Sequence, residues 1–165
     1  MADGSRADVT DIPTCASFVS RESARIAFTL AALNGLDLLA GDCEGAHLNA
    51  PSREKLHTKC GPEYGAEHEG RCALIVRALC GSKSAAASWR AAISKVISDL
   101  GFTPCRADND VWMMPGVNRA NEKIWEYVLV YLDDLLVLGL NPRAILDGIL
   151  MVYKLKAGSD LTLVR

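Results

Sequence analysis

The sequence lacks the features of a membrane-spanning, exported or strongly basic chain. Its only long apolar run, residues 126–139, is too short to span a bilayer and carries Asp133 and Asp134 near its middle. The opening MADGSRADVT has no apolar core of the kind that a signal peptide needs. Lysine and arginine (18) do not outnumber aspartate and glutamate (20), so phosphate binding would need a local basic groove. We therefore expect no membrane partner.

Low-complexity tracts and internal repeats are also missing. The 165 residues are 50% hydrophobic, which is enough apolar material to bury a core in one globular domain over residues 1–165.

The six cysteines form no tight framework, which favours reduced thiols in a cytosolic or nuclear protein. His57 and Cys60, then His68 and Cys72, come close to the spacing of zinc ligands around a loop that contains glycine and proline. A small zinc-binding module is therefore one interpretation of this segment, and ordinary surface-loop residues are the other.

Two helices are predicted with clear ends. Ser20 can cap a helix that Gly35 ends, and Ile26, Leu30 and Leu33 share one face that should pack on the rest of the chain. The second helix covers residues 84–100, and Gly101 closes it. Its buried stripe is expected to comprise Trp89, Ile93, Val96, Ile97 and Leu100.

Apolar segments between turn residues predict strands. They are LDLLAGD with Asp42 at its end, residues 72–79, DVWMM, IWEYVLVY and LLVLG, and Pro51 is expected to break regular structure. A last helix is expected from Asn141 and Pro142, with Gly158 after it. This irregular mixture favours an α+β fold, an antiparallel sheet with helices on one face.

The pair Asp133–Asp134 stands between two strongly apolar strands. If these strands form a hairpin, the pair lies in its tight connection, where aspartate is a good turn residue. Strands this apolar indicate a central hairpin, and crowded carboxylates repel each other unless a cation such as Mg²⁺ neutralises them. Asp42 is the best candidate for a third carboxylate in a two-metal site.

Five blocks resemble the reverse transcriptases of copia-type retrotransposons, in order, from about residue 7 to residue 160. YLDD resembles the YxDD hairpin, and GDCEGAHLNAPSREK resembles the segment with the first catalytic aspartate. The other blocks are RALCGSKSAAASWR, LGFTPCRADNDVW and YKLKAGSD.

The resemblance implies a right-hand polymerase palm with part of the fingers, which makes DNA on an RNA or DNA template with two Mg²⁺ ions, or Mn²⁺ in their place. Asp42, Asp133 and Asp134 would be the catalytic and metal-binding carboxylates. The remaining site residues would be Gly45, Ala46 and His47 at the incoming nucleotide, Tyr131 at the primer end and Lys83 on the template side.

Further partners follow from the same resemblance. They are a primed template, deoxynucleoside triphosphates and the integrase and RNase H segments of a Pol polyprotein. The expected location is the cytoplasm, a virus-like particle or the nucleus.

The chain departs from the family at several positions. His47 stands where the family has Phe or Tyr, the residue that stacks beneath the sugar, and Cys80 and Ser82 replace Tyr and Leu. The family's basic triphosphate grip, thumb and RNase H domain are expected to lie outside the chain. Basic residues that could line a nucleic-acid groove are Arg53, Lys55, Lys59, Arg77, Lys83, Arg90 and Lys95. Two interpretations remain: a polymerase domain, or a decayed, inactive remnant that keeps the fold, with or without nucleic-acid or metal binding.

Overall fold

The computed structural model describes residues 13–118, 120–156 and 161–163. The chain forms two compact units. The hairpin unit comprises residues 1–16 and 45–92, and the sheet unit comprises residues 17–44 and 93–165.

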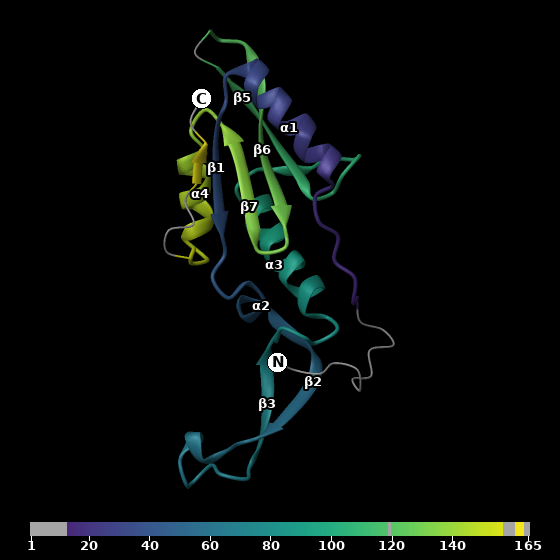
Figure 1. Cartoon of the computed structure of the whole chain (residues 1–165), viewed down its shortest axis with the longest axis vertical. Helices are drawn as coiled ribbons and strands as arrows, with labels where there is room; N and C mark the ends of the chain where they lie inside the picture. Colours follow the sequence, from purple (N-terminus) through teal and green to yellow (C-terminus); the bar gives the residue numbers. More distant parts are fainter. Residues whose placement is uncertain (1–12, 119, 157–160, 164–165) are drawn as a thin grey trace. The chain divides into compact units, whose positions relative to one another are not determined.

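The sheet unit contains a six-stranded antiparallel sheet with strand order β4-β5-β6-β7-β1-β8 (Figure 1). The α+β class and the antiparallel sheet are as predicted. The strands are β1 Asp37–Asp42, β4 Thr103–Pro104, β5 Val111–Val117, β6 Lys123–Tyr131, β7 Asp134–Gly139 and β8 Leu161–Leu163.

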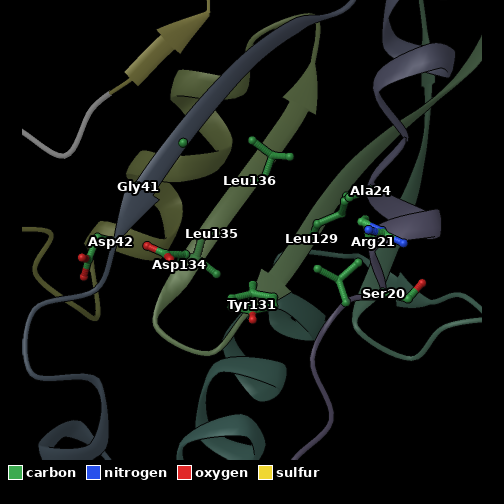
Figure 2. Close-up of a pocket in the computed structure, with 12 residues that line it drawn as sticks. Ser20, Arg21, Ala24, Gly41, Asp42, Leu129, Tyr131, Asp134, Leu135 and Leu136 are labelled. Carbon is green, nitrogen blue, oxygen red and sulfur yellow. The ribbon is translucent and has the colours of Figure 1, made fainter. Parts of the chain in front are cut away.

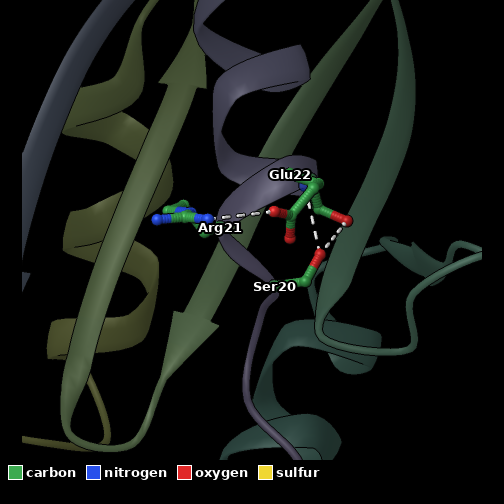
Figure 3. A network of polar contacts seen from close by, with 4 residues as sticks. Ser20, Arg21 and Glu22 are labelled. Carbon is green, nitrogen blue, oxygen red and sulfur yellow. Dashed lines mark hydrogen bonds and ion pairs between the residues drawn. The ribbon is translucent and has the colours of Figure 1, made fainter.

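Helices cover both faces of this sheet, so the prediction of helices on one face is wrong. Leu38 and Leu129 belong to the core cluster that includes residues of α1 (Arg21–Asn34). Gly41, whose side-chain position points to the opposite face, lies against Leu146 of α4 (Pro142–Leu150). Figure 3 agrees, since α1 lies in front of the strands and α4 behind them. The central strands are apolar on both faces, and each face has to be covered.

Helix α1 has the predicted ends but not the predicted buried face. The Ser20 side chain accepts a hydrogen bond from the Ser23 backbone N–H, and Gly35 ends the helix in the left-handed conformation. Ala27 and Ala31 are buried, and Leu30 is partly buried against the core as predicted, whereas Ile26 and Leu33 are 60% and 77% exposed. Small alanine side chains let the helix axis approach the sheet closely, and this packing determines the buried face.

Helix α3 (Ala85–Asp99) follows the prediction closely. Trp89, Ile93 and Ile97 are buried, and Gly101 follows the helix with φ +97°. Val96 and Leu100 are only half-buried.

The predicted last helix is shorter than expected. Asn141 caps α4 as predicted, but the helix ends at Leu150. The chain then turns so that Leu155 can form a β-bridge with Cys43, which an uninterrupted helix would prevent. Gly158 lies outside the described residues.

The hairpin unit consists mainly of a two-stranded ribbon, β2 Pro51–Lys59 and β3 Cys72–Arg77, with α2 (Ala46–Asn49) before it and the 3₁₀ helix η2 (Pro62–Tyr64) between the strands. The predicted break at Pro51 is wrong, because Pro51 is the first residue of β2, a position where a strand tolerates proline. Glu54 is buried, and its Oε1 accepts hydrogen bonds from the backbone N–H (2.6 Å) and the hydroxyl (2.7 Å) of Ser84. This contact joins the ribbon to the start of α3.

Within the part of the chain that the structure describes, no helix is long and apolar enough to cross a membrane.

Candidate active site

The predicted hairpin is present, and a two-residue turn closes it. Strands β6 and β7 pair down to Tyr131 and Asp134, which leaves Leu132 and Asp133 as the turn. The prediction that both aspartates lie in the connection is therefore wrong for Asp134, which is the first residue of β7. Leu132 has φ +55°, a left-handed conformation that is uncommon for a leucine. The strongly paired apolar strands hold this turn in place, and with it the backbone of Asp133.

The third predicted carboxylate lies beside the other two. Strand β1 pairs with β7 so that Asp42 is directly opposite Asp134. The backbone N–H of Cys43 donates a hydrogen bond to the carbonyl oxygen of Asp133 at 2.8 Å. Figure 2 shows the side chains of Asp42 and Asp134 at the adjoining ends of their strands. The fold thus brings together Asp42, Asp133 and Asp134, three residues that the sequence analysis joined only by inference.

A lysine that the sequence analysis did not assign binds one of these carboxylates. The Nζ atom of Lys156 donates a hydrogen bond to Oδ2 of Asp42 at 2.6 Å. The other oxygen, Oδ1, is buried and has no hydrogen-bond partner. Asp42 therefore has one oxygen in an ion pair and one still able to accept a ligand.

The electrostatics reflect the crowding of negative charge. Burial, followed by the charges of Asp133 and Asp42, raises the pKa of the Asp134 carboxyl above its ordinary value, and Lys156 partly opposes this. Burial, followed by the same carboxylates, raises the pKa of the Cys43 thiol to about 12. Cys43 is therefore a protonated, unreactive core thiol.

A cavity of about 630 Å³ adjoins the carboxylates within the sheet unit. Its walls come from the start of α1 and from strands β1, β6 and β7 (Figure 2). The lining residues are Val19, Ser20, Arg21, Ala24, Ala40, Gly41, Asp42, Leu129, Tyr131, Asp134, Leu135 and Leu136. The cavity is mostly apolar, with acidic groups and an arginine at its polar positions.

Tyr131, predicted to lie near the primer end, lines this cavity. Its ring meets that of Phe18 edge to face, with centroids 4.9 Å apart. The N-terminus of α1 is fixed close by through Ser20, and Arg21 forms an ion pair with Glu22 at 3.6 Å (Figure 3). Arg21 remains largely exposed, so its guanidinium is accessible to solvent.

The remaining predicted site residues belong to the hairpin unit. Gly45 precedes α2 with φ +60°, Ala46 is buried and His47 is half-buried. Lys83 is half-buried in the turn just before α3. The structure therefore brings together the three carboxylates and Tyr131 within one unit, and places the predicted nucleotide and template residues in the other.

Among the described residues, no three His, Cys, Asp or Glu side chains are arranged to hold one metal ion. This applies to His57, Cys60, His68 and Cys72, which lie along β2, β3 and the segment between them, and the zinc-module interpretation gains no support. It also applies to the three aspartates in the conformation described, in which Lys156 occupies Oδ2 of Asp42.

The family model described as "Reverse transcriptase (RNA-dependent DNA polymerase)" matches residues 6–162. The chain belongs to the reverse transcriptase family. A search of curated proteins finds no match, and neither does a search of solved structures.

Lys156 and Glu54 are the polar residues that the sequence analysis missed. Lys156 lies in the segment YKLKAGSD, but only the pairing of distant segments shows its contact with Asp42. Glu54 resembles any charged strand residue in the sequence, and only its burial reveals its role.

Proposed function

We propose that this reverse transcriptase family member adds deoxynucleotides to a primer on an RNA template, with Asp42, Asp133 and Asp134 as metal-binding carboxylates. The observation that supports this proposal best is the pairing of Asp42 with Asp134 beside the turn that carries Asp133. Carboxylates so close together are unfavourable without a cation, and oxygen ligands suit Mg²⁺.

The chemistry of the donors fits a pair of Mg²⁺ ions, or Mn²⁺ in their place. Asp42 Oδ1 is buried without a hydrogen-bond partner, and a metal ion would satisfy it. When bound, the two ions would activate the primer hydroxyl and stabilise the leaving pyrophosphate. The protein itself contributes a rigid support, since β1, β6 and β7 are hydrogen-bonded to one another up to the carboxylates.

The cavity beside the carboxylates suits the end of a primer. Its apolar floor and the exposed ring of Tyr131 offer surfaces for a sugar and a base. We assign the incoming nucleotide to Gly45, Ala46 and His47, since the left-handed Gly45 leaves room for the close approach of a ligand to the backbone.

The hairpin unit supplies a basic surface that fits the template. Exposed and less exposed residues alternate along β2 as far as His57, and Arg53, Lys55 and Lys59 are all exposed. Phosphate groups would be the natural partners of such a strand. We propose that the sheet unit is the palm, that the hairpin unit is part of the fingers, and that Lys83 contacts the template.

Primer extension tests this function. The chain is incubated with a primed RNA template, the four deoxynucleoside triphosphates and Mg²⁺ or Mn²⁺, and compared with Asp133→Asn. We expect extension by the chain and a loss of about 100-fold or more in the variant, because a metal-binding carboxylate contributes several kcal/mol to the transition state.

Asp37→Asn is the matched control, because Asp37 lies at the other end of β1 and the substitution removes the same charge. Extension that is lost in Asp133→Asn and kept in Asp37→Asn supports the proposal. Equal extension by all three proteins would contradict the assigned site. Absence of extension in all three would favour the inactive remnant. No observation described above supports that alternative better than it supports the polymerase.

The biological setting is part of the same proposal. We propose that the chain comes from a copia-type retrotransposon, acts beside the integrase and RNase H segments of a Pol polyprotein, and works in the cytoplasm, a virus-like particle or the nucleus.

A further inference from the structure

We propose that Lys156 is a built-in counter-cation of the carboxylate cluster, which a divalent ion must displace from Asp42 in order to bind. This inference rests on the proposed metal site and adds that Lys156 lowers the affinity of that site for divalent ions. The Nζ atom of Lys156 lies 2.6 Å from Oδ2 of Asp42, so a ligand atom expected to bind metal is already in an ion pair.

The position of Lys156 is fixed by the backbone around it. Its N–H donates to the carbonyl oxygen of Asp42 at 2.9 Å, and the N–H of Glu44 donates to the carbonyl oxygen of Lys154 at 2.7 Å. Between these two contacts, Leu155 forms a β-bridge with Cys43. Residues 154–156 therefore continue the sheet alongside the end of β1, and the ammonium group of Lys156 lies at the Asp42 carboxylate.

The side chain of Leu155 strengthens this attachment. Its terminal methyl groups would lie 3.0 and 3.3 Å from a Cβ atom at Gly41, so the residue packs closely on β1. The absence of a side chain at Gly41 leaves the space that Leu155 occupies. The lysine is thus anchored by its backbone and by its neighbour, while the ammonium group can still move on four methylene groups.

The charges explain why a cation is favourable at this point. Asp42, Asp133 and Asp134 bring three negative charges to adjoining positions, and Lys156 supplies one positive charge. A divalent ion offers more charge than the ammonium does, so it can replace Lys156 at Asp42 and would then be repelled by the displaced group.

The expected effect is a change in metal affinity of measurable size. Lys156 is about half exposed, so its charge acts through a water-like dielectric. At a separation of about 5 Å, repulsion between an ammonium and a divalent ion then weakens binding about tenfold. Removal of the charge should therefore tighten metal binding by that factor, whether or not the protein is active.

The experiment measures Mn²⁺ binding to the whole chain by electron paramagnetic resonance of the free ion, at fixed ionic strength. Lys156→Met removes the charge, Lys156→Arg keeps it, and Lys154→Met removes a charge from the same segment as the matched control. Asp133→Asn reports whether binding occurs at the carboxylates, and circular dichroism checks that each variant is folded.

We expect Lys156→Met to bind Mn²⁺ about ten times more tightly than the unaltered chain. Lys156→Arg and Lys154→Met should bind Mn²⁺ with nearly the affinity of the unaltered chain. Equal affinities in all lysine variants, with binding that Asp133→Asn removes, would overturn this inference and leave the proposed metal site intact. Weaker binding by Lys156→Met would also overturn it, because the lysine would then serve to position Asp42. If Asp133→Asn bound Mn²⁺ as tightly as the unaltered chain, or if the unaltered chain bound none, the proposed metal site would be wrong, and this inference with it.

Discussion

Gly41 lies one residue before Asp42, and its lack of a side chain should be essential for the packing behind the candidate site. A Cβ atom at this position would lie 3.0 Å from a terminal carbon of Leu155 and 3.4 Å from one of Leu146. Gly41→Val adds an isopropyl group to a space that is already filled. We expect it to lower the free energy of unfolding by about 1–3 kcal/mol through overpacking.

A second substitution makes this prediction sharper. Leu155→Ala removes an isopropyl group from the same space and, because Leu155 is only half-buried, should cost about 2 kcal/mol alone. The double variant restores the volume, so its loss should be smaller than the sum of the single losses by about 1 kcal/mol or more. The assay is urea unfolding followed by circular dichroism, with the free energies extrapolated to water.

Gly116→Val in β5 is the matched control. A Cβ atom at Gly116 would meet its neighbours at 3.5 Å, an ordinary contact, and none of those neighbours is Leu155. Its effect should therefore add to that of Leu155→Ala. The reasoning would be refuted if Gly41→Val and Leu155→Ala were additive to within about 0.5 kcal/mol, since the two side chains would then not compete for one space.

Three further predictions concern groups outside the carboxylate cluster. Burial alone would raise the pKa of Asp108, but hydrogen bonds, including one at 3.0 Å from the backbone N–H of Ser20, lower it below its ordinary value. The ionised Asp108 therefore stabilises the fold at pH values above the carboxyl pKa of the unfolded chain, about 3.9. In urea unfolding, the difference in free energy of unfolding between the unaltered chain and Asp108→Asn should shrink as the pH falls below that value. Glu54→Ala leaves the buried N–H and hydroxyl of Ser84 without their acceptor and should cost about 2–4 kcal/mol, whereas Glu54→Gln keeps an acceptor and should cost less, as urea unfolding would show. Gly45→Ala should cost about 1 kcal/mol in thermal unfolding, because φ is +60° there; no loss would mean that the left-handed turn is not needed.

Local signals in the sequence predicted the ends of elements well. Ser20 and Gly35 mark the limits of α1 because capping depends on the residues at the helix ends themselves. The β6–β7 hairpin was predictable for a similar reason, since its two apolar strands are separated by only two residues. The position of Asp42 at the end of β1 followed from the same kind of pattern.

Features that depend on contacts between distant segments were harder to predict from the sequence. The periodicity of α1 favoured Ile26 and Leu33 as buried residues, but the sheet selects Ala27 and Ala31, because small side chains permit closer packing. Strands that are apolar throughout did carry a signal for cover on both faces of the sheet, which the sequence analysis did not use. The ion pair of Lys156 with Asp42 joins segments far apart in the sequence, and no local pattern predicts it.

The pairing of β1 with β7 also has a consequence for the order of events during folding. Asp42 and Asp134 meet only when a loop of about 90 residues has closed, whereas the β6–β7 hairpin needs only its own two strands. Contacts of such long range form slowly compared with local ones. A chain emerging from the ribosome can complete the hairpin that carries Asp133 and Asp134 once β7 has been made. Lys156, the partner of Asp42, comes only after the whole of α4 and the segment beyond it. The contact between Lys156 and Asp42 can thus form only after the residues of all three carboxylates have been synthesised.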